Sequence, residues 1–319
     1  MLSTLSARST CRCARLPSLI SKPARAPALR TFASTPRSTL SLHAARRSWL
    51  LAGTIAGAGL AYAAWELKPE ALPSLPVVHA EVPPSSSTYI DPTTKTPFPS
   101  TLTGPDGTRL RLVGTGVRTV SFLSIRVYAC GFYVSERELD AAKAGKIEGW
   151  QGYTPERLLP PFAIPPGEPE RPVGEALIDN LLEKADAAVV IVPLRNTSLP
   201  HLRDGFSRAL VARMKVPSVA AAFDETVSER TGAALIEFKS FFPSRTLVKG
   251  APLELYYSAV DRSVLFQLRD EKTGAPEPLG TLRDGLLSKE LMVSYFSDTA
   301  APSEELRKSV AMGFNGEER

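Results

Sequence analysis

The middle of the chain alternates hydrophobic and polar residues with a period of two, which is typical of β-strands. After the turn signal Pro105-Asp106-Gly107, the stretch Arg109-Leu-Arg-Leu-Val113 follows this alternation. Gly114-Thr-Gly116 then predicts a break, and residues 117–134 supply β-branched and aromatic side chains for a second strand. Further strands are predicted over residues 187–193, 253–259, 263–268 and 277–282.

Apolar residues recur with helical spacing between and after these strands. Ser135 and Glu138 form a capping-box pair that predicts a short helix ending at Lys143. The other predicted helices cover residues 173–185, 202–214, 218–241, 286–296 and 302–312, and a Pro-rich loop covers residues 149–172. The order is strands, helices, strands, helices. It favours an α+β architecture, with helices layered on an antiparallel sheet, over a doubly wound parallel sheet.

The first 65 residues differ in composition from the rest of the 319-residue chain. They contain nine Arg or Lys and no Asp or Glu, so the remainder carries 29 of the 38 basic and all 33 acidic side chains, a formal net charge of −4. An acid-free N-terminus rich in Arg, Ser and Ala is typical of a mitochondrial presequence, and Arg30-Thr-Phe32 predicts cleavage after Phe32. A chloroplast transit peptide shares this composition and stays an alternative. The acidic remainder gives no support to a nucleic-acid-binding surface.

Residues 49–65 form an uncharged stretch with Trp49 and Trp65 at its ends. As a helix they would extend about 25 Å, within the range that membrane-spanning helices use. The basic residues before this stretch place its N-terminal end in the matrix by the positive-inside rule. We therefore predict a single helix in the inner membrane. An extension of the import signal or a buried Ala/Gly helix are the alternatives.

These predictions divide the chain into five parts. A presequence covers residues 1–32, a basic matrix segment 33–48, the transmembrane helix 49–65, a Pro-rich linker 66–100, and the folded domain 101–319 in the intermembrane space. Gly53 and Gly57 give the transmembrane helix a face for close approach of a partner helix.

Standard catalytic signatures are missing from the folded part. Gly114-Thr-Gly116 lacks the third glycine of a dinucleotide loop, because Thr119 stands at that position. There is no P-loop, no Gly-x-Ser-x-Gly elbow and no cluster of Cys and His with metal-ligand spacing. Three cysteines exclude a disulfide scaffold, and His201 is the only histidine after residue 100.

Several motifs of the folded part nevertheless occur in a recognisable order. Leu112-Val-Gly-Thr-Gly-Val-Arg118 and Ile125-Arg-Val-Tyr-Ala-Cys-Gly-Phe-Tyr-Val-Ser-Glu136 resemble the N-terminal hairpin of the chalcone isomerase family, G-x-G-x-R followed by a strand ending A-x-G-x-Y. The likeness continues at Arg203-Asp-Gly-Phe206, Phe242-Pro-Ser244 and Leu286-Leu-Ser288. With the N-terminal segments in front, the chain looks most like the fungal "altered inheritance of mitochondria" branch. The resemblance implies an open-faced β-sandwich, in which helices back an antiparallel sheet and a ligand cleft lies between them.

The resemblance also implies site residues. The family's plant enzymes close a 2′-hydroxychalcone into a flavanone without a cofactor, and non-enzymatic relatives bind fatty acids. Arg118 falls on the arginine that guides the phenolate or the fatty-acid carboxylate. Tyr128 falls on a catalytic threonine, Ser294 on a position where the enzymes use Ser or Thr, His201 on a catalytic tyrosine and Arg208 on an asparagine. Two or three of the five polar positions are therefore changed, which argues against flavonoid cyclisation.

Four functions follow from these residues. The first is a membrane-anchored domain that binds an anionic amphipathic ligand of the fatty-acid type, with its head on Arg118. An active intramolecular lyase or isomerase is the first alternative. Haem binding with His201 as axial ligand is another, in which Arg118 and Arg208 would suit the propionates. The fourth is a purely structural role through the Gly53 and Gly57 helix face. No metal is expected, and no cofactor other than this haem.

Overall fold

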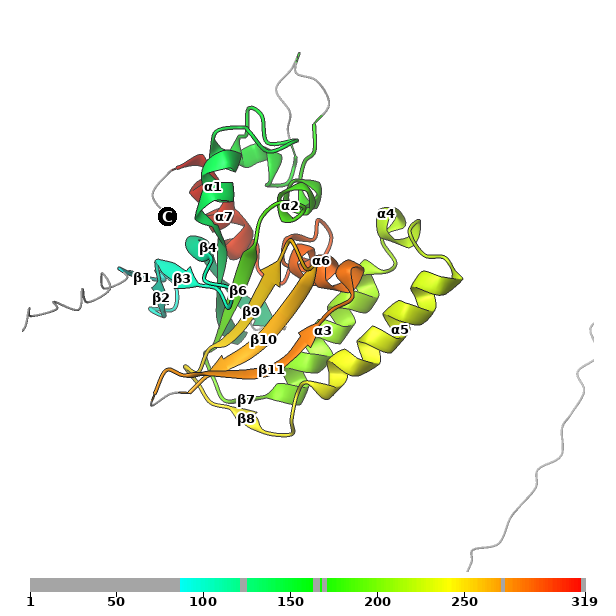
Figure 1. Ribbon diagram of the computed structural model, residues 1–319. Coiled ribbons are helices and arrows are strands. Elements are labelled where there is room, and N and C mark those ends of the chain that lie inside the picture. The colour runs from blue at the N-terminus through cyan, green and yellow to red at the C-terminus, as the bar shows by residue number, and fades with distance from the viewer. Residues whose placement is uncertain (1–86, 121–124, 163–166, 168–170, 271–272, 317–319) are drawn as a thin grey trace, which may run out of the picture. The chain divides into compact units, whose positions relative to one another are not determined.

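The computed structural model describes residues 87–120, 125–162, 167, 171–270 and 273–316 (Figure 1). The predicted presequence, basic segment and membrane helix, with Gly53 and Gly57, lie outside these residues. Within the described residues, no helix is both long and apolar enough to cross a bilayer.

Seven strands form the main sheet, in the order β11-β10-β9-β6-β5-β4-β3. They are β3 (Thr101–Thr103), β4 (Arg109–Val120), β5 (Ile125–Ser135), β6 (Ala187–Pro193), β9 (Leu253–Ser258), β10 (Ser263–Arg269) and β11 (Pro276–Leu282). Two short ladders accompany the sheet, β1 (Thr88–Ile90) with β2 (Pro97–Pro99), and β7 (Thr197–Ser198) with β8 (Thr246–Leu247). Every neighbouring pair in the main sheet is antiparallel, so the predicted α+β architecture is confirmed.

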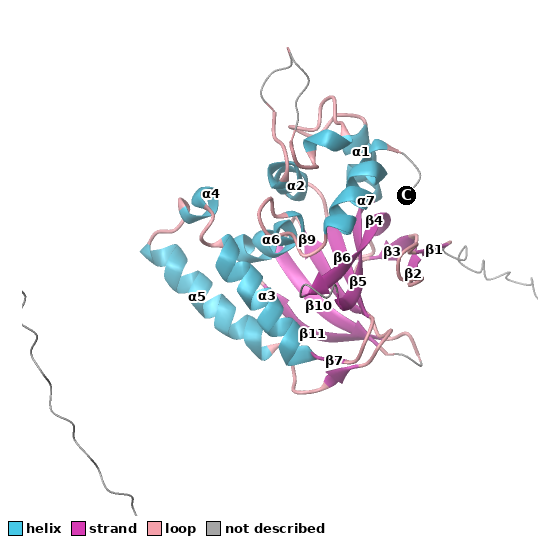
Figure 2. Ribbon diagram, turned by 180° about the vertical axis from the view of Figure 1, so that it is seen from behind, coloured by secondary structure: helices cyan, strands magenta, loops and turns pink. Residues whose placement is uncertain are grey.

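The helices gather mainly on one face and at one end of the sheet. They are α1 (Glu136–Lys143), η1 (Pro155–Arg157), α2 (Glu175–Leu182), α3 (Leu199–Arg213), α4 (Pro217–Ala220), α5 (Glu225–Ser240), α6 (Gly285–Val293), η2 (Ser294–Phe296) and α7 (Glu304–Asn315). Figures 1 and 2 show α3, α5 and α6 together on the same side of β9, β10 and β11. Helix α7 packs against β4 instead.

The alternation of the strands sorts their side chains onto two faces. In β6, Val189 and Ile191 join the large core under the helices, whereas Ala188 and Val190 join a smaller cluster on the opposite face. The same division recurs in β5, β9 and β10. The second face therefore carries a smaller apolar cluster, next to the hydrogen-bonded Glu254 and Gln267, without a helical layer over it, as the open-faced sandwich predicts.

The predicted break at Gly114-Thr-Gly116 is wrong, because β4 continues through it. A Cβ atom on Gly114 would lie 2.5 Å from the backbone nitrogen of Val310, and one on Gly116 would lie 2.5 Å from the Cα of Leu306. Both glycines are required because the backbone of α7 lies directly on this strand. The two glycines of this motif therefore allow α7 to pack closely against β4.

Three other local predictions differ from the structure. The single helix predicted over residues 218–241 is two helices, because Asp224 caps α5 by accepting a hydrogen bond from the Val227 N–H at 2.7 Å. Ser135 precedes α1 as predicted but makes no side-chain cap hydrogen bond. The predicted linker also ends too late: β1 and β2 lie within it, and Phe98 is fully buried on the open face of the sheet.

Candidate ligand site

Arg118 and Tyr128 face each other across two neighbouring strands. They are cross-strand partners in the β4–β5 ladder, and a register shift follows directly after Arg118. The Arg118 Nη1 donates to the Tyr128 hydroxyl at 3.4 Å, and the guanidinium carbon lies 5.8 Å from the ring centroid. The ladder thus fixes a cation against an aromatic ring under the helical layer.

A cavity of about 220 Å³ lies next to this pair, between the sheet and the helices. Four of the five predicted site residues line it: Arg118 from β4, Tyr128 from β5, Arg208 from α3 and Ser294 from η2. Its other walls are largely apolar and include Phe206, Ala209, Ala212, Ala300 and Pro302. Residues almost 180 positions apart in the sequence therefore meet at one cavity.

The charge of Arg118 is not balanced within the described part of the chain. No carboxylate there lies within 4 Å of its guanidinium, and Tyr128 is its one hydrogen-bond partner. Burial opposes the charged form, but the interactions with Tyr128 and Tyr295 outweigh it and raise the pKa of Arg118. A half-buried guanidinium that stays protonated at every physiological pH is a natural partner for an anion.

Two tyrosine hydroxyls accompany this cation. Tyr295 is almost fully buried, lines the cavity, and has no hydrogen bond of acceptable geometry at its hydroxyl. Burial raises the pKa of Tyr295 well above its ordinary value, and burial likewise raises the pKa of Tyr128. Both hydroxyls therefore keep their protons and can donate to an anionic group.

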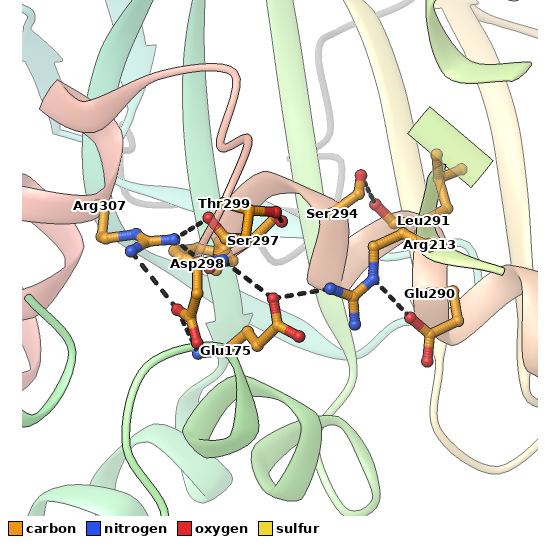
Figure 3. A network of polar contacts seen from close by, with 10 residues as sticks. Glu175, Arg213, Glu290, Leu291, Ser294, Ser297, Asp298, Thr299 and Arg307 are labelled. Carbon is orange, nitrogen blue, oxygen red and sulfur yellow. Dashed lines mark hydrogen bonds and ion pairs between the residues drawn. The ribbon is translucent and has the colours of Figure 1, made fainter. Parts of the chain in front are cut away.

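The remaining predicted residues contribute less to the cavity. The Ser294 Oγ donates to the Leu291 carbonyl at 2.6 Å (Figure 3), so its proton is used within its own helix. Arg208 is exposed at the cavity edge. His201 is exposed in the first turn of α3 and is not among the residues that line the cavity.

The cavity does not fit haem. Its volume is about 220 Å³, and His201, the candidate axial ligand, is exposed and lies outside it. In the described ranges, no group of three or more His, Cys, Asp or Glu could hold a metal ion.

A buried ionic network lies behind the cavity wall (Figure 3), and Arg213 is its charged residue that lines the cavity. Arg213 lies between two carboxylates, with Nη1 2.7 Å from Glu175 Oε2 and Nε 2.7 Å from Glu290 Oε2. Glu175 accepts at 2.9 Å from the N–H of Asp298, whose carboxylate lies 3.5 Å from Arg307. The network joins α2, α3, α6 and α7 to the segment after η2, and so holds the helical wall of the cavity together.

Sequence reasoning missed Tyr295 and this network. Tyr295 directly follows the predicted Ser294, but nothing in its spacing indicates a buried hydroxyl at the cavity. The network joins residues up to 123 positions apart, so no local pattern could reveal it.

Comparison with known proteins agrees with this fold. Residues 108–311 match the family model "Chalcone isomerase like". The chain is 31% identical over 226 residues to the Altered inheritance of mitochondria protein 18, mitochondrial, of Eremothecium gossypii, covering 67% of this chain and 70% of that protein. It is 27% identical over 253 residues to the protein of the same name from Debaryomyces hansenii, covering 74% of this chain and 77% of that protein.

Among solved structures, the fatty-acid binding protein AtFAP1 of Arabidopsis thaliana is similar, with a TM-score of 0.50 and 16% identity. The match covers 72% of this chain and 98% of that protein. At this identity the likeness supports the fold alone: a curled antiparallel sheet with helices, as the resemblance implied.

Proposed function

The chain belongs to the chalcone isomerase-like family, and from that premise we propose that its folded part binds an anionic amphipathic molecule, a fatty acid or related carboxylate. The observation that carries the proposal is the unpaired Arg118 in a cavity with largely apolar walls. Removing a cation partly from water without a counter-ion costs free energy, and a bound carboxylate would offset that cost.

The cavity supports a particular pose. Its 220 Å³ is room for about seven groups of the size of a water molecule, which suits a carboxylate and the first methylenes of its chain. In this pose the carboxylate accepts from Arg118 and from the Tyr295 hydroxyl. The rest of the chain leaves along the apolar side of α3, between Gly205 and Ala212.

Replacing Arg118 tests the proposal. We expect Arg118→Gln to weaken binding of a delipidated full-length chain to a long-chain acyl carboxylate by about 10- to 100-fold, because one charge-assisted contact is lost. Binding is measured by native mass spectrometry and by the rise in Tm on adding ligand. Arg137→Gln is the matched control, since that arginine side chain is 90% exposed. Equal binding by wild type and Arg118→Gln would contradict the proposal.

Tyr295→Phe separates ligand contact from folding. The hydroxyl makes no hydrogen bond of good geometry and interacts only with the neighbouring Tyr128 hydroxyl, so the ligand-free variant should keep a Tm close to that of wild type. Its affinity for the carboxylate should fall severalfold. If Tyr295→Phe binds the carboxylate as tightly as wild type does, the Tyr295 hydroxyl is not part of the site. The role of Arg118 is tested separately by Arg118→Gln.

The relatives described above are named mitochondrial, and we extend this to a finer proposal for the present chain. The presequence and the span over residues 49–65 would anchor it in the inner membrane, with the folded part in the intermembrane space. A protease added to mitochondria should then digest the folded part only after the outer membrane is ruptured. Protection until the inner membrane is also opened would place it in the matrix.

A further inference from the structure

The open face of the sheet carries a second and larger hollow. Its volume is about 1310 Å³, and it lies between the segment that holds β1 to β3 and the ends of β6, β9 and β10. Its apolar floor includes Phe98, Leu102, Val190 and Val192. Because the alternation of the strands sends these side chains away from Arg118 and the helices, this hollow is separate from the cavity under α3.

Cations collect at one end of this hollow. Arg126 is the second residue of β5, Arg195 follows β6 and Lys249 precedes β9, and all three line the hollow. Hydrogen bonds hold their segments side by side: the Leu194 N–H donates to the Val127 carbonyl at 3.0 Å, and the Gly250 N–H to the Pro193 carbonyl at 2.9 Å. The three cations are thus brought to one edge by the sheet, although they are far apart in sequence.

These cations have no acidic partners in the part of the chain that the structure describes. No carboxylate there lies within 4 Å of Arg126, Arg195, Lys249 or the nearby Lys95. Among the described residues, Glu254 is the one carboxylate that lines the hollow; it is almost fully buried and accepts from Arg269 at 2.6 Å. The hollow is therefore strongly positive, whereas residues 66–319 have a net charge of −4.

We propose that this hollow binds an anionic phospholipid, with its acyl chains on the apolar floor and its phosphate at Arg126, Arg195 and Lys249. Its volume exceeds the roughly 300–1,000 Å³ of sites for drug-sized ligands, which favours a two-chain lipid. The floor is the face of a sheet, whose backbone groups already pair with neighbouring strands. An extended peptide would find few backbone partners there, whereas an acyl chain needs none.

The experiment compares two lipids on the full-length chain in a non-ionic detergent. Dioleoylphosphatidylglycerol should bind at least tenfold more tightly than dioleoylphosphatidylcholine, as counted by native mass spectrometry. The double variant Arg195→Gln and Lys249→Gln should weaken the binding of phosphatidylglycerol about 30-fold, because it removes two cations that attract the anionic headgroup. Arg137→Gln with Lys239→Gln removes the same charge from exposed positions elsewhere and should leave binding unchanged.

The outcomes separate this site from the cavity at Arg118. Arg118→Gln should bind phosphatidylglycerol normally, and the double variant should bind the acyl carboxylate normally. Equal binding of the two lipids, or equal losses in the two double variants, would overturn the proposal. So would complete displacement of the lipid by inorganic phosphate or by an acidic peptide, because the apolar floor would then add nothing.

Discussion

Gly116→Ala should destabilise the folded part by about 4 kcal/mol, since the added methyl group has no space to occupy. It would lie 2.5 Å from the Cα and 2.7 Å from the Cβ of Leu306 in α7. These are backbone or near-backbone atoms, so no side-chain rotation relieves the overlap and α7 must move away from β4. That movement would expose Leu306, Val310 and Phe314, which are buried in the core.

Chemical denaturation followed by circular dichroism measures this loss. Gly232→Ala in α5 is the matched control, because a Cβ there meets nothing within 4 Å. That substitution should stabilise the chain by up to about 1 kcal/mol through the higher helix propensity of alanine. If Gly116→Ala were as stable as wild type, the close contact between α7 and β4 would be disproved.

Arg213→Leu should cost about 3–5 kcal/mol at pH 7, because it leaves Glu290 buried without its counter-ion. The Glu290 side chain is only 4% exposed. Burial already raises the pKa of Glu290 in the native state, against the opposing effect of Arg213. Without the arginine, its folded pKa rises further above the unfolded value of about 4.3.

The sign of the pH dependence follows from this shift. Between the unfolded and the folded pKa of Glu290, the native state binds more protons than the unfolded state, so stability falls as the pH rises. The penalty of Arg213→Leu is therefore largest at neutral pH and shrinks on acidification towards pH 5. Unfolding in urea at pH 5, 6, 7 and 8 measures the difference from wild type.

Two controls define the result. Arg213→Leu with Glu290→Leu should recover most of the stability and lose the pH dependence, because no charge of that pair stays buried alone. Arg245→Leu breaks the exposed pair with Glu277 and should cost less than about 1 kcal/mol. A penalty for Arg213→Leu that is the same at pH 5 and pH 8 would show that Glu290 is not the group left uncompensated.

Sequence motifs predict some residues of the candidate site and not others. Arg118 and Tyr128 were accessible from the sequence, because they lie on adjacent strands of one hairpin whose pattern resembles a known family. The resemblance also places His201 at this site, but a single helix start gives no register against the sheet, and its side chain is exposed. Tyr295 and Arg213 carry no local signal, since their importance comes from burial and from partners on distant elements.

The approximate positions of the main strands and helices in the folded part follow from the sequence, because periods of two and of 3.6 are local consequences of backbone geometry; the exact breaks, such as the continuity of β4 and the division between α4 and α5, do not. The basic N-terminus and the uncharged stretch after it are likewise properties of the sequence, and the role predicted for them needs no tertiary contact. Tertiary structure decided why Gly114 and Gly116 are glycines, which residues share the cavity, and where unpaired cations gather. Each of these depends on distances between segments far apart in the chain, which no pattern of neighbouring residues encodes.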